Sequence, residues 1–196
     1  MNRITVAPGL VLDEDMYGVA AEALATRLPS LAPLSFDEFV APSLWENIPE
    51  EDGEISRAQA VLLRSRQLTV KINVWHREDK RGKGAPMPHN HPWEHFTSYV
   101  LMGGYDEHRW HLDAVGNIAE NLDVTHDAPT VNRVDKEDYH EVPRVHVPGR
   151  TMTLMVCGAG RKGDWGYLDL DTGAHNPLQP VGNFAELYAA VNPHRR

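Results

Sequence analysis

The front of the chain has the apolar spacing of an amphipathic helix. Residues 13–28, "DEDMYGVAAEALATRL", place four apolar side chains at roughly helical intervals: Met16, Val19, Leu24 and Leu28. Acidic residues open this segment, where the helix dipole favours them. Pro29 follows, and a proline disfavours helical backbone at the residue before it. The pattern therefore predicts a helix that ends near residue 28.

Two further helix starts follow from capping patterns. Ser35 precedes Glu38 by three residues in "SFDEFV", which is the spacing of a capping box. Ser56 and Gln59 repeat that spacing before "AVLLRSR". Residues 1 to 66 are thus predicted to form a helical N-terminal extension that packs on the rest of the protein.

From residue 67 onward the pattern becomes that of β-strands. Residues 67–76, "QLTVKINVWH", alternate and are rich in β-branched side chains. "FTSYVLM" and "YDEHRWHL", joined by Gly103 and Gly104, are predicted to form a hairpin. "VGN" at 115–117 predicts a turn, and further short strands are predicted in "TVNRV", "TMTLMVCG" and "WGYLDL". Many short strands with glycine and proline turns favour a sandwich or barrel.

The end of the chain returns to a helical pattern. In "NFAELYAAV", Asn183 and Glu186 occupy capping positions, which predicts a last helix over one sheet. The expected fold is mainly β: a barrel and C-terminal helix over residues 67 to 196, preceded by the helical extension. With 196 residues, the chain is expected to form a single structural domain overall.

Composition narrows the classes of partner. The net charge of −9 argues against nucleic acid, because phosphate contacts require clusters of Lys and Arg. No apolar stretch approaches the roughly 20 residues of a membrane span, and the N-terminus lacks the apolar core of a signal peptide. The single cysteine, Cys157, excludes an internal disulfide and fits a reduced, cytoplasmic location. Its apolar neighbours indicate a small core residue rather than a nucleophile.

Histidines provide the candidate chemistry. Five of the eleven histidines lie between His89 and His111. His89 and His91 form a His-x-His pair, and on a strand both rings lie on the same face. A single pair of this kind arises by chance in many proteins. His140, about 50 residues later and next to an apolar run, is a candidate third ligand.

These motifs resemble those of the cupin superfamily. Gly84, His89, His91 and Gly103 fit the frame of its first motif, and His140 fits the histidine of the second. "HNHPW", "GGYDE", "YHEV" and "DWGY" occur in the order found in a group of small cupin-like proteins. The Pro-x-Gly that usually precedes the second-motif histidine is absent, and Arg144 stands where an asparagine is usual. The resemblance implies a cupin-type β-barrel (a double-stranded β-helix or jelly roll) with a metal site, and a homodimer, but it specifies no reaction.

The chain departs from the cupin pattern at the position of the usual glutamate. Counting from the neighbouring motif residues gives Phe96 twice and His95 once. The predicted metal ligands are therefore His89, His91 and His140. Three other residues are candidates for a further ligand or for a hydrogen bond behind the ligands: His95, Glu94 and Glu107.

Three neutral imidazoles leave open positions on a metal ion. Imidazole suits several metals, so we expect one divalent transition metal, Fe(II) first, with Zn, Ni, Mn and Cu as alternatives. Tyr105 and Arg109, on one face of a strand, are predicted to bind a carboxylate-bearing substrate. The alternative is a solvated face on which Arg109 pairs with Glu107. Ser98 and Trp165 complete the predicted substrate residues. Trp165 lies on the last predicted strand, where a place in a pocket wall is one interpretation and packing in the core is the favoured one.

The sequence is compatible with three functions. The first is a mononuclear non-heme oxygenase or dioxygenase, an oxidoreductase that acts on a small amino- or carboxylic-acid-like metabolite with O₂. The second is a non-redox isomerase, lyase or hydrolase with Zn, Mn or Ni. The third is a non-catalytic cupin that binds a small ligand. Metal content together with O₂ uptake separates the three.

Overall fold

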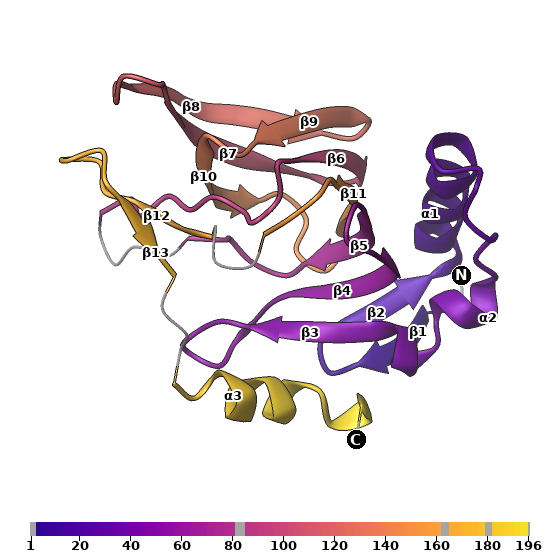
Figure 1. Cartoon of the computed structure of the whole chain (residues 1–196). Coiled ribbons are helices and arrows are strands. Elements are labelled where there is room, and N and C mark those ends of the chain that lie inside the picture. Colours follow the sequence, from indigo (N-terminus) through magenta and orange to yellow (C-terminus); the bar gives the residue numbers. More distant parts are fainter. Residues whose placement is uncertain (1–2, 81–84, 162–164, 179–181, 196) are drawn as a thin grey trace.

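The computed structural model describes residues 3–80, 85–161, 165–178 and 182–195, and its fold is mainly β, as predicted. A helix lies near each end of the chain (Figure 1). The first strands are β1 (Arg3–Ala7), β2 (Leu10–Asp13), β3 (Trp45–Pro49), β4 (Ile55–Arg64), β5 (Thr69–Trp75) and β6 (His95–Met102). The later strands are β7 (Gly104–Leu112), β8 (Ile118–Asp127), β9 (Thr130–Asp135), β10 (Asp138–Val145), β11 (Thr151–Cys157), β12 (Gly166–Leu168) and β13 (His175–Pro177). The helices are α1 (Glu14–Arg27), α2 (Phe36–Phe39), α3 (Phe184–Val191) and the short 3₁₀ turns η1 (Pro42–Leu44) and η2 (Pro193–Arg195).

Two antiparallel sheets carry the fold. The large sheet has the strand order β3-β4-β5-β11-β6-β9, and the smaller one has the order β10-β7-β8. His89 bridges β10 to the β12–β13 pair, because it makes isolated bridges with both His140 and Tyr167. The β12–β13 pair lies on the opposite side of the molecule from α1 (Figure 1). The chain segment that carries His89 is thus part of the small sheet's hydrogen bonding.

The predicted hairpin at Gly103 is wrong. β6 pairs with β11 and β9, whereas β7 pairs with β10 and β8, so the two glycines form a corner between sheets. Gly103 has a φ of 67°, and a Cβ atom there would lie 2.5 Å from Oγ1 of Thr151. The hairpin forms instead between β7 and β8, around the turn predicted at 115–117, where Gly116 has a φ of 91°.

The helical prediction for the N-terminal third is correct only in part. Helix α1 forms with Asp13 as its N-cap, and the capping box of Ser35 and Glu38 starts the short helix α2. The helix predicted after Ser56 is wrong, since these residues form β4. Strand β4 pairs with β5 along its length, so the large sheet continues across the expected boundary at residue 66. Small buried residues alternate with larger polar ones in the first part of β4, and this period of two is that of a strand and not of a helix.

The main hydrophobic core lies between the N-terminal elements and the outer face of the large sheet. Met16 of α1, Phe39 of α2 and Trp45 of β3 are fully buried there. Alternate residues of β4, β5 and β11 point into this core: Ala58, Ala60, Val70, Ile72, Val74, Met152 and Leu154. The remaining residues of these strands point toward the small sheet. Because the apolar core is built on the outer face, the inner face can carry polar groups.

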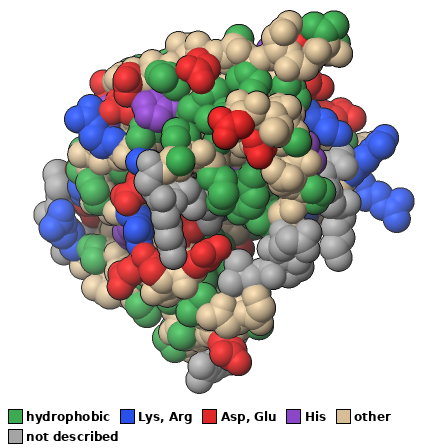
Figure 2. Space-filling model, turned by 90° about the vertical axis from the view of Figure 1, so that its left-hand side faces the viewer, with side chains coloured by type: hydrophobic (Ala, Val, Ile, Leu, Met, Phe, Trp, Pro, Cys, Tyr) green, Lys and Arg blue, Asp and Glu red, His purple; other side chains and the backbone are tan. Residues whose placement is uncertain are grey.

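Helix α3 packs against β3, and Tyr188 donates a hydrogen bond to Glu46. This confirms the predicted C-terminal helix, but Asn183 makes no side-chain capping bond. Among the described residues, no helix combines the length and apolar character needed to cross a membrane. On the face shown in Figure 2, basic side chains lie apart from one another with acidic side chains between them.

Candidate metal centre

Three histidine rings meet between the sheets. Each of His89, His91 and His140 offers one ring nitrogen, and these three nitrogens lie within 4.8 Å of one another. The Nε2 atoms of His91 and His140 are 2.9 Å apart. Ring centroids in the group are separated by 5.0–5.1 Å. Among the described residues, these three alone form a group of histidine, cysteine or carboxylate side chains with metal-ligand spacing.

Backbone pairing brings the rings together. His89 and His140 exchange both backbone hydrogen bonds, at 3.1 and 2.8 Å. Asn90, between the two histidines of the pair, faces the other way, and its side chain accepts a hydrogen bond from the backbone of Gly166 at 2.9 Å. The His-x-His alternation expected of a strand therefore holds in a segment that forms only isolated bridges.

A hydrogen bond to Glu107 favours one tautomer of His140. Its Oε1 atom accepts a hydrogen bond from Nδ1 of His140 at 2.7 Å, so Nε2 of that ring keeps its lone pair. The carboxylate also accepts hydrogen bonds from Arg109, His126 and Asn132. Burial alone would raise the pKa of Glu107, but the hydrogen bonds from His126 and His140, helped by Arg109, lower it. The carboxylate is therefore ionised inside the protein.

His91 is held in its neutral form. Burial first, and then the neighbouring rings of His140 and His89, keep the pKa of His91 well below its usual range. The ring stacks on Trp93 with centroids 5.5 Å apart and meets the edge of Phe96 at 5.0 Å. A neutral imidazole is the form that binds a metal. Phe96, to which two of the three counts assign the usual cupin glutamate, brings an apolar ring to the histidines.

His89 has an acidic neighbour that the sequence did not indicate. Nε2 of His89 lies 3.7 Å from Oδ2 of Asp79, and both side chains are almost fully buried. Nη1 of Arg57 lies 3.6 Å from the same oxygen. Asp79 follows β5 and forms an isolated bridge with Val142 of β10, which links the two sheets near the site.

Two of the other three candidates, Glu94 and His95, are not part of the group of three rings. Glu94 is exposed. His95 opens β6 and rests against Gly158, where an added Cβ would lie 3.0 Å from its ring. Gly84 of the first motif and Asp164 of "DWGY" lie outside the described residues. The site is thus built from three imidazoles, with Glu107 hydrogen-bonded to His140 and Asp79 lying 3.7 Å from His89.

The predicted substrate residues Arg109 and Tyr105 both form hydrogen bonds within the protein. Arg109 donates to Glu107 at 2.6 Å, to Asn132 at 2.5 Å and to the carbonyl of Arg133 at 2.8 Å, so its guanidinium is engaged within the protein. This is the Glu107–Arg109 pair of the alternative interpretation, although Glu107 is buried rather than solvated. Tyr105 accepts a hydrogen bond from Asn132. Burial and the Glu107 charge raise the pKa of Tyr105 to about 12.

Ser98 and Trp165 occupy different surroundings. Ser98 is buried on the inner face of β6 and hydrogen-bonds Tyr105. Trp165 is half-buried before β12, and its indole N–H has no hydrogen-bond partner among the described residues. His126 lies against Glu107, with its Nε2 atom 3.2 Å from Oε2 of the carboxylate. Cys157 is fully buried, as expected, and burial raises the pKa of its thiol to about 11.

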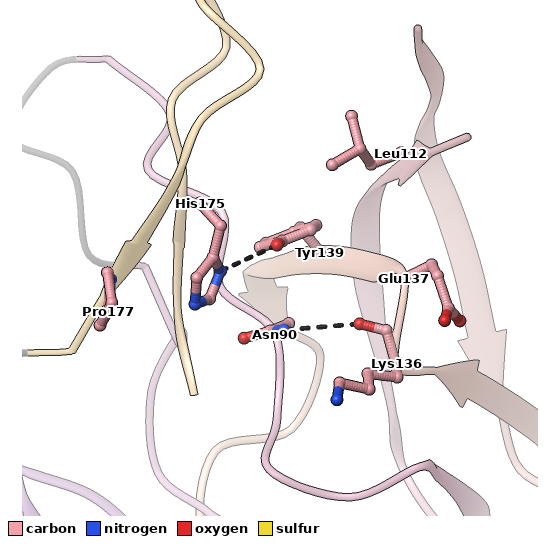
Figure 3. Close-up of a pocket in the computed structure, with 7 residues that line it drawn as sticks. All are labelled: Asn90, Leu112, Lys136, Glu137, Tyr139, His175 and Pro177. Carbon is pink, nitrogen blue, oxygen red and sulfur yellow. Dashed lines mark hydrogen bonds between the residues drawn. The ribbon is translucent and has the colours of Figure 1, made fainter. Parts of the chain in front are cut away.

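A pocket of about 380 Å³ is lined by residues other than the three histidines, among them Tyr139 of β10 (Figure 3). Tyr139 and His175 point toward one another across it, with the phenol oxygen 2.9 Å from Nδ1 of the ring. Asn90 reaches the carbonyl of Lys136 at 3.4 Å. This pocket is therefore separate from the histidine centre, and Tyr139 faces away from the centre as its alternation with His140 predicts.

Comparisons with known proteins give structural likenesses only. No family model and no curated protein matches the chain. KdgF from Halomonas sp. aligns over 60% of this chain and 88% of its own, with 12% identity and a TM-score of 0.40. Pac13, described as a nucleoside dehydratase, aligns over 64% and 85%, with 14% identity and a TM-score of 0.41. An RmlC-like cupin from Shewanella frigidimarina aligns over 60% and 86%, with 15% identity and a TM-score of 0.35. These overlaps are partial, and neither family membership nor activity follows from them.

Proposed function

We propose that the protein is a mononuclear metal enzyme whose ligands are His89, His91 and His140. The observation that carries the proposal is that three ring nitrogens from two separate segments lie within 4.8 Å of one another. The donors fit a metal ion in protonation as well as in position. His91 is neutral, and Glu107 holds the Nδ1 proton of His140 so that Nε2 can bind.

We propose Fe(II) as the metal and a small amino or carboxylic acid as the substrate. Three neutral ligands leave open positions on the ion, and bound Fe(II) would supply redox chemistry with O₂. The protein's own contribution is to hold and enclose the site. Trp93 and Phe96 place aromatic rings against His91, which limits access of water on that side. Glu107 and its partners fix the orientation of His140.

A non-redox reaction is the second candidate, and Asp79 favours it. Its carboxylate lies 3.7 Å from Nε2 of His89, so a base stands at the edge of the proposed centre. A carboxylate in that position can accept a proton from a bound substrate. With Zn, Mn or Ni in the site, an isomerase, lyase or hydrolase would use this base.

Metal content and O₂ consumption separate the candidates. The purified protein is analysed for transition metals, and the Fe(II)-loaded and Zn²⁺-loaded forms are placed in an oxygen electrode with amino and carboxylic acids. We expect about one metal ion per chain and O₂ uptake only with Fe(II). Turnover with Zn²⁺ and without O₂ would establish the non-redox candidate. A protein that takes up no metal would contradict both, and metal binding without turnover would leave a binding protein.

A further inference from the structure

The inner face of the large sheet carries buried charged and polar side chains that the proposed centre does not use. In the register of β4 and β5, Arg57 pairs with Trp75, Gln59 with Asn73, and Val61 with Lys71. Paired residues share a face, and the intervening residues Ala58, Ala60, Ile72 and Val74 fill the outer core. Arg57, Gln59, Lys71 and Asn73 therefore point inward, on the side of the histidines.

Two cations on this face lie beside the histidines. Nζ of Lys71 lies 5.0 Å from the ring centre of Trp93, and that ring stacks on His91. Nη1 of Arg57 lies 3.6 Å from Asp79, whose other neighbour is His89. One intervening side chain thus separates each cation from a proposed metal ligand. Burial, and then the charge of Arg57, lower the pKa of Lys71 to about 8, consistent with two cations in one region.

Several of these polar groups lack part of their possible hydrogen bonds to the described residues. Lys71 is 8% exposed, and among the described residues its ammonium has one hydrogen bond, to Gln59 at the long distance of 3.5 Å. Among the described residues, Nη1 of Arg57 has no hydrogen-bond acceptor, although it lies 3.6 Å from Oδ2 of Asp79. Oδ1 of the fully buried Asn73 has no hydrogen-bond donor among the described residues. Buried charges are costly unless they are paired and hydrogen-bonded, so this arrangement favours the entry of an anion.

We propose that Lys71 and Arg57 form a carboxylate-binding subsite beside the three histidines, and that the substrate is a small carboxylic acid held there by its carboxylate. This inference rests on the proposed metal function, because it assigns the substrate class of that same centre. A bound divalent ion adds positive charge beside Arg57 and Lys71, and of these two cations Arg57 lies near the Asp79 carboxylate. A carboxylate neutralises this charge, accepts from the ammonium and the guanidinium, and leaves its other end toward the metal. Lys71 and Arg57 take the role that Arg109 cannot fill while it is bonded to Glu107.

Calorimetric titration tests the subsite without measuring turnover. Zn²⁺-loaded protein is titrated with acetate, malonate, succinate and glutamate, with malonamide as a neutral analogue and inorganic phosphate as a second oxyanion. We expect at least one carboxylate to bind and malonamide not to bind. Lys71→Met and Arg57→Met should each weaken that binding about ten- to hundredfold, the loss typical of a hydrogen bond between charged groups. Arg66→Met removes an exposed cation and is the matched control, with unchanged affinity.

Zinc content and circular dichroism of each variant separate loss of the subsite from loss of the fold, and Lys71→Arg should retain part of the affinity. Wild-type affinity in both methionine variants would show that the metal alone holds the carboxylate, and it would overturn the proposal. Equal binding of malonamide, tighter binding of phosphate, or no binding by any carboxylate would also overturn it. Lys71-dependent carboxylate binding in a chain that takes up no zinc would retain the subsite and refute the metal function.

Discussion

Oε1 of Glu107 lies 2.7 Å from Nδ1 of His140 in the interior between the two sheets. The contact joins neighbouring strands, since β7 and β10 pair with His140 opposite Arg109. The same carboxylate accepts from Arg109 and His126, so one buried anion organises three basic side chains. A carboxylate that hydrogen-bonds the second nitrogen of a histidine is common behind metal ligands, and this contact therefore supports the proposed metal site.

Replacing Glu107 should weaken metal binding while the ligands stay in place. In Glu107→Gln, the charge that holds the Nδ1 proton of His140 is lost, and we expect the affinity for Zn²⁺ to fall about ten- to hundredfold. Competition with a chromophoric chelator measures the change. Glu94→Gln, which removes an exposed carboxylate, should bind as the wild type does. Equal affinities for the two variants would contradict the role of Glu107.

Variants that lack one histidine each should distinguish the metal ligands from a histidine that only lies nearby. We expect His89→Ala, His91→Ala and His140→Ala to lose most or all bound metal, because each removes one donor from the group of three. His95→Ala should keep most of it, since its ring rests against Gly158 outside that group. Elemental analysis of the four purified variants gives the result. Equal loss from all four would make His95 a fourth ligand.

Lys71 should make stability depend on pH. Burial lowers its pKa from 10.5 to about 8, so the unfolded chain holds this proton over a range in which the folded protein has released it. The buried charge therefore reduces stability below pH 8, and that penalty is relieved as the pH rises from about 8 toward 10.5. We expect Lys71→Met to be more stable than the wild type at pH 7, by an amount on the order of 3 kcal/mol.

Urea unfolding at several pH values between 7 and 10 measures this difference. The advantage of Lys71→Met should shrink as the pH rises, because the wild type then loses the buried charge. Taking the difference between the two proteins removes the contribution of groups that do not interact with Lys71, such as Tyr105, whose pKa is raised. The thiol of Cys157 interacts with Lys71, so its contribution stays in the difference. A constant difference across the range would show that Lys71 is not desolvated.

Gly103 should tolerate alanine less well than Gly116 does. Both have positive φ, so alanine strains the backbone at either position, at a cost of about 1 kcal/mol. At Gly103 the new Cβ would also meet Oγ1 of Thr151 at 2.5 Å and its Cα at 2.9 Å, whereas at Gly116 no atom of the described residues lies within 4 Å of it. We expect Gly103→Ala to lose about 1–3 kcal/mol more in free energy of unfolding. Similar losses in chemical denaturation would mean that the corner between the sheets can relax.

Local patterns predicted the elements whose neighbours in sequence decide their structure. Helix α1 and the capping box of α2 follow from side chains three or four residues apart, and β5 follows from alternation of β-branched residues. The prediction of a hairpin at Gly103 was wrong because turn-forming glycines do not specify whether the next strand pairs within the same sheet. The tightness of that corner depends on Thr151, which lies 48 positions further along the chain.

The sequence by itself determined that His89 and His91 share one face, because this relation depends on alternation over a few residues. Only the tertiary structure decided which groups surround the three rings. Asp79, Arg57, Lys71 and His126 come from different strands and loops, and strand pairing alone brings them to the interior. The physical reason is that charge pairing and burial depend on distance in space, which periodicity along a chain does not encode.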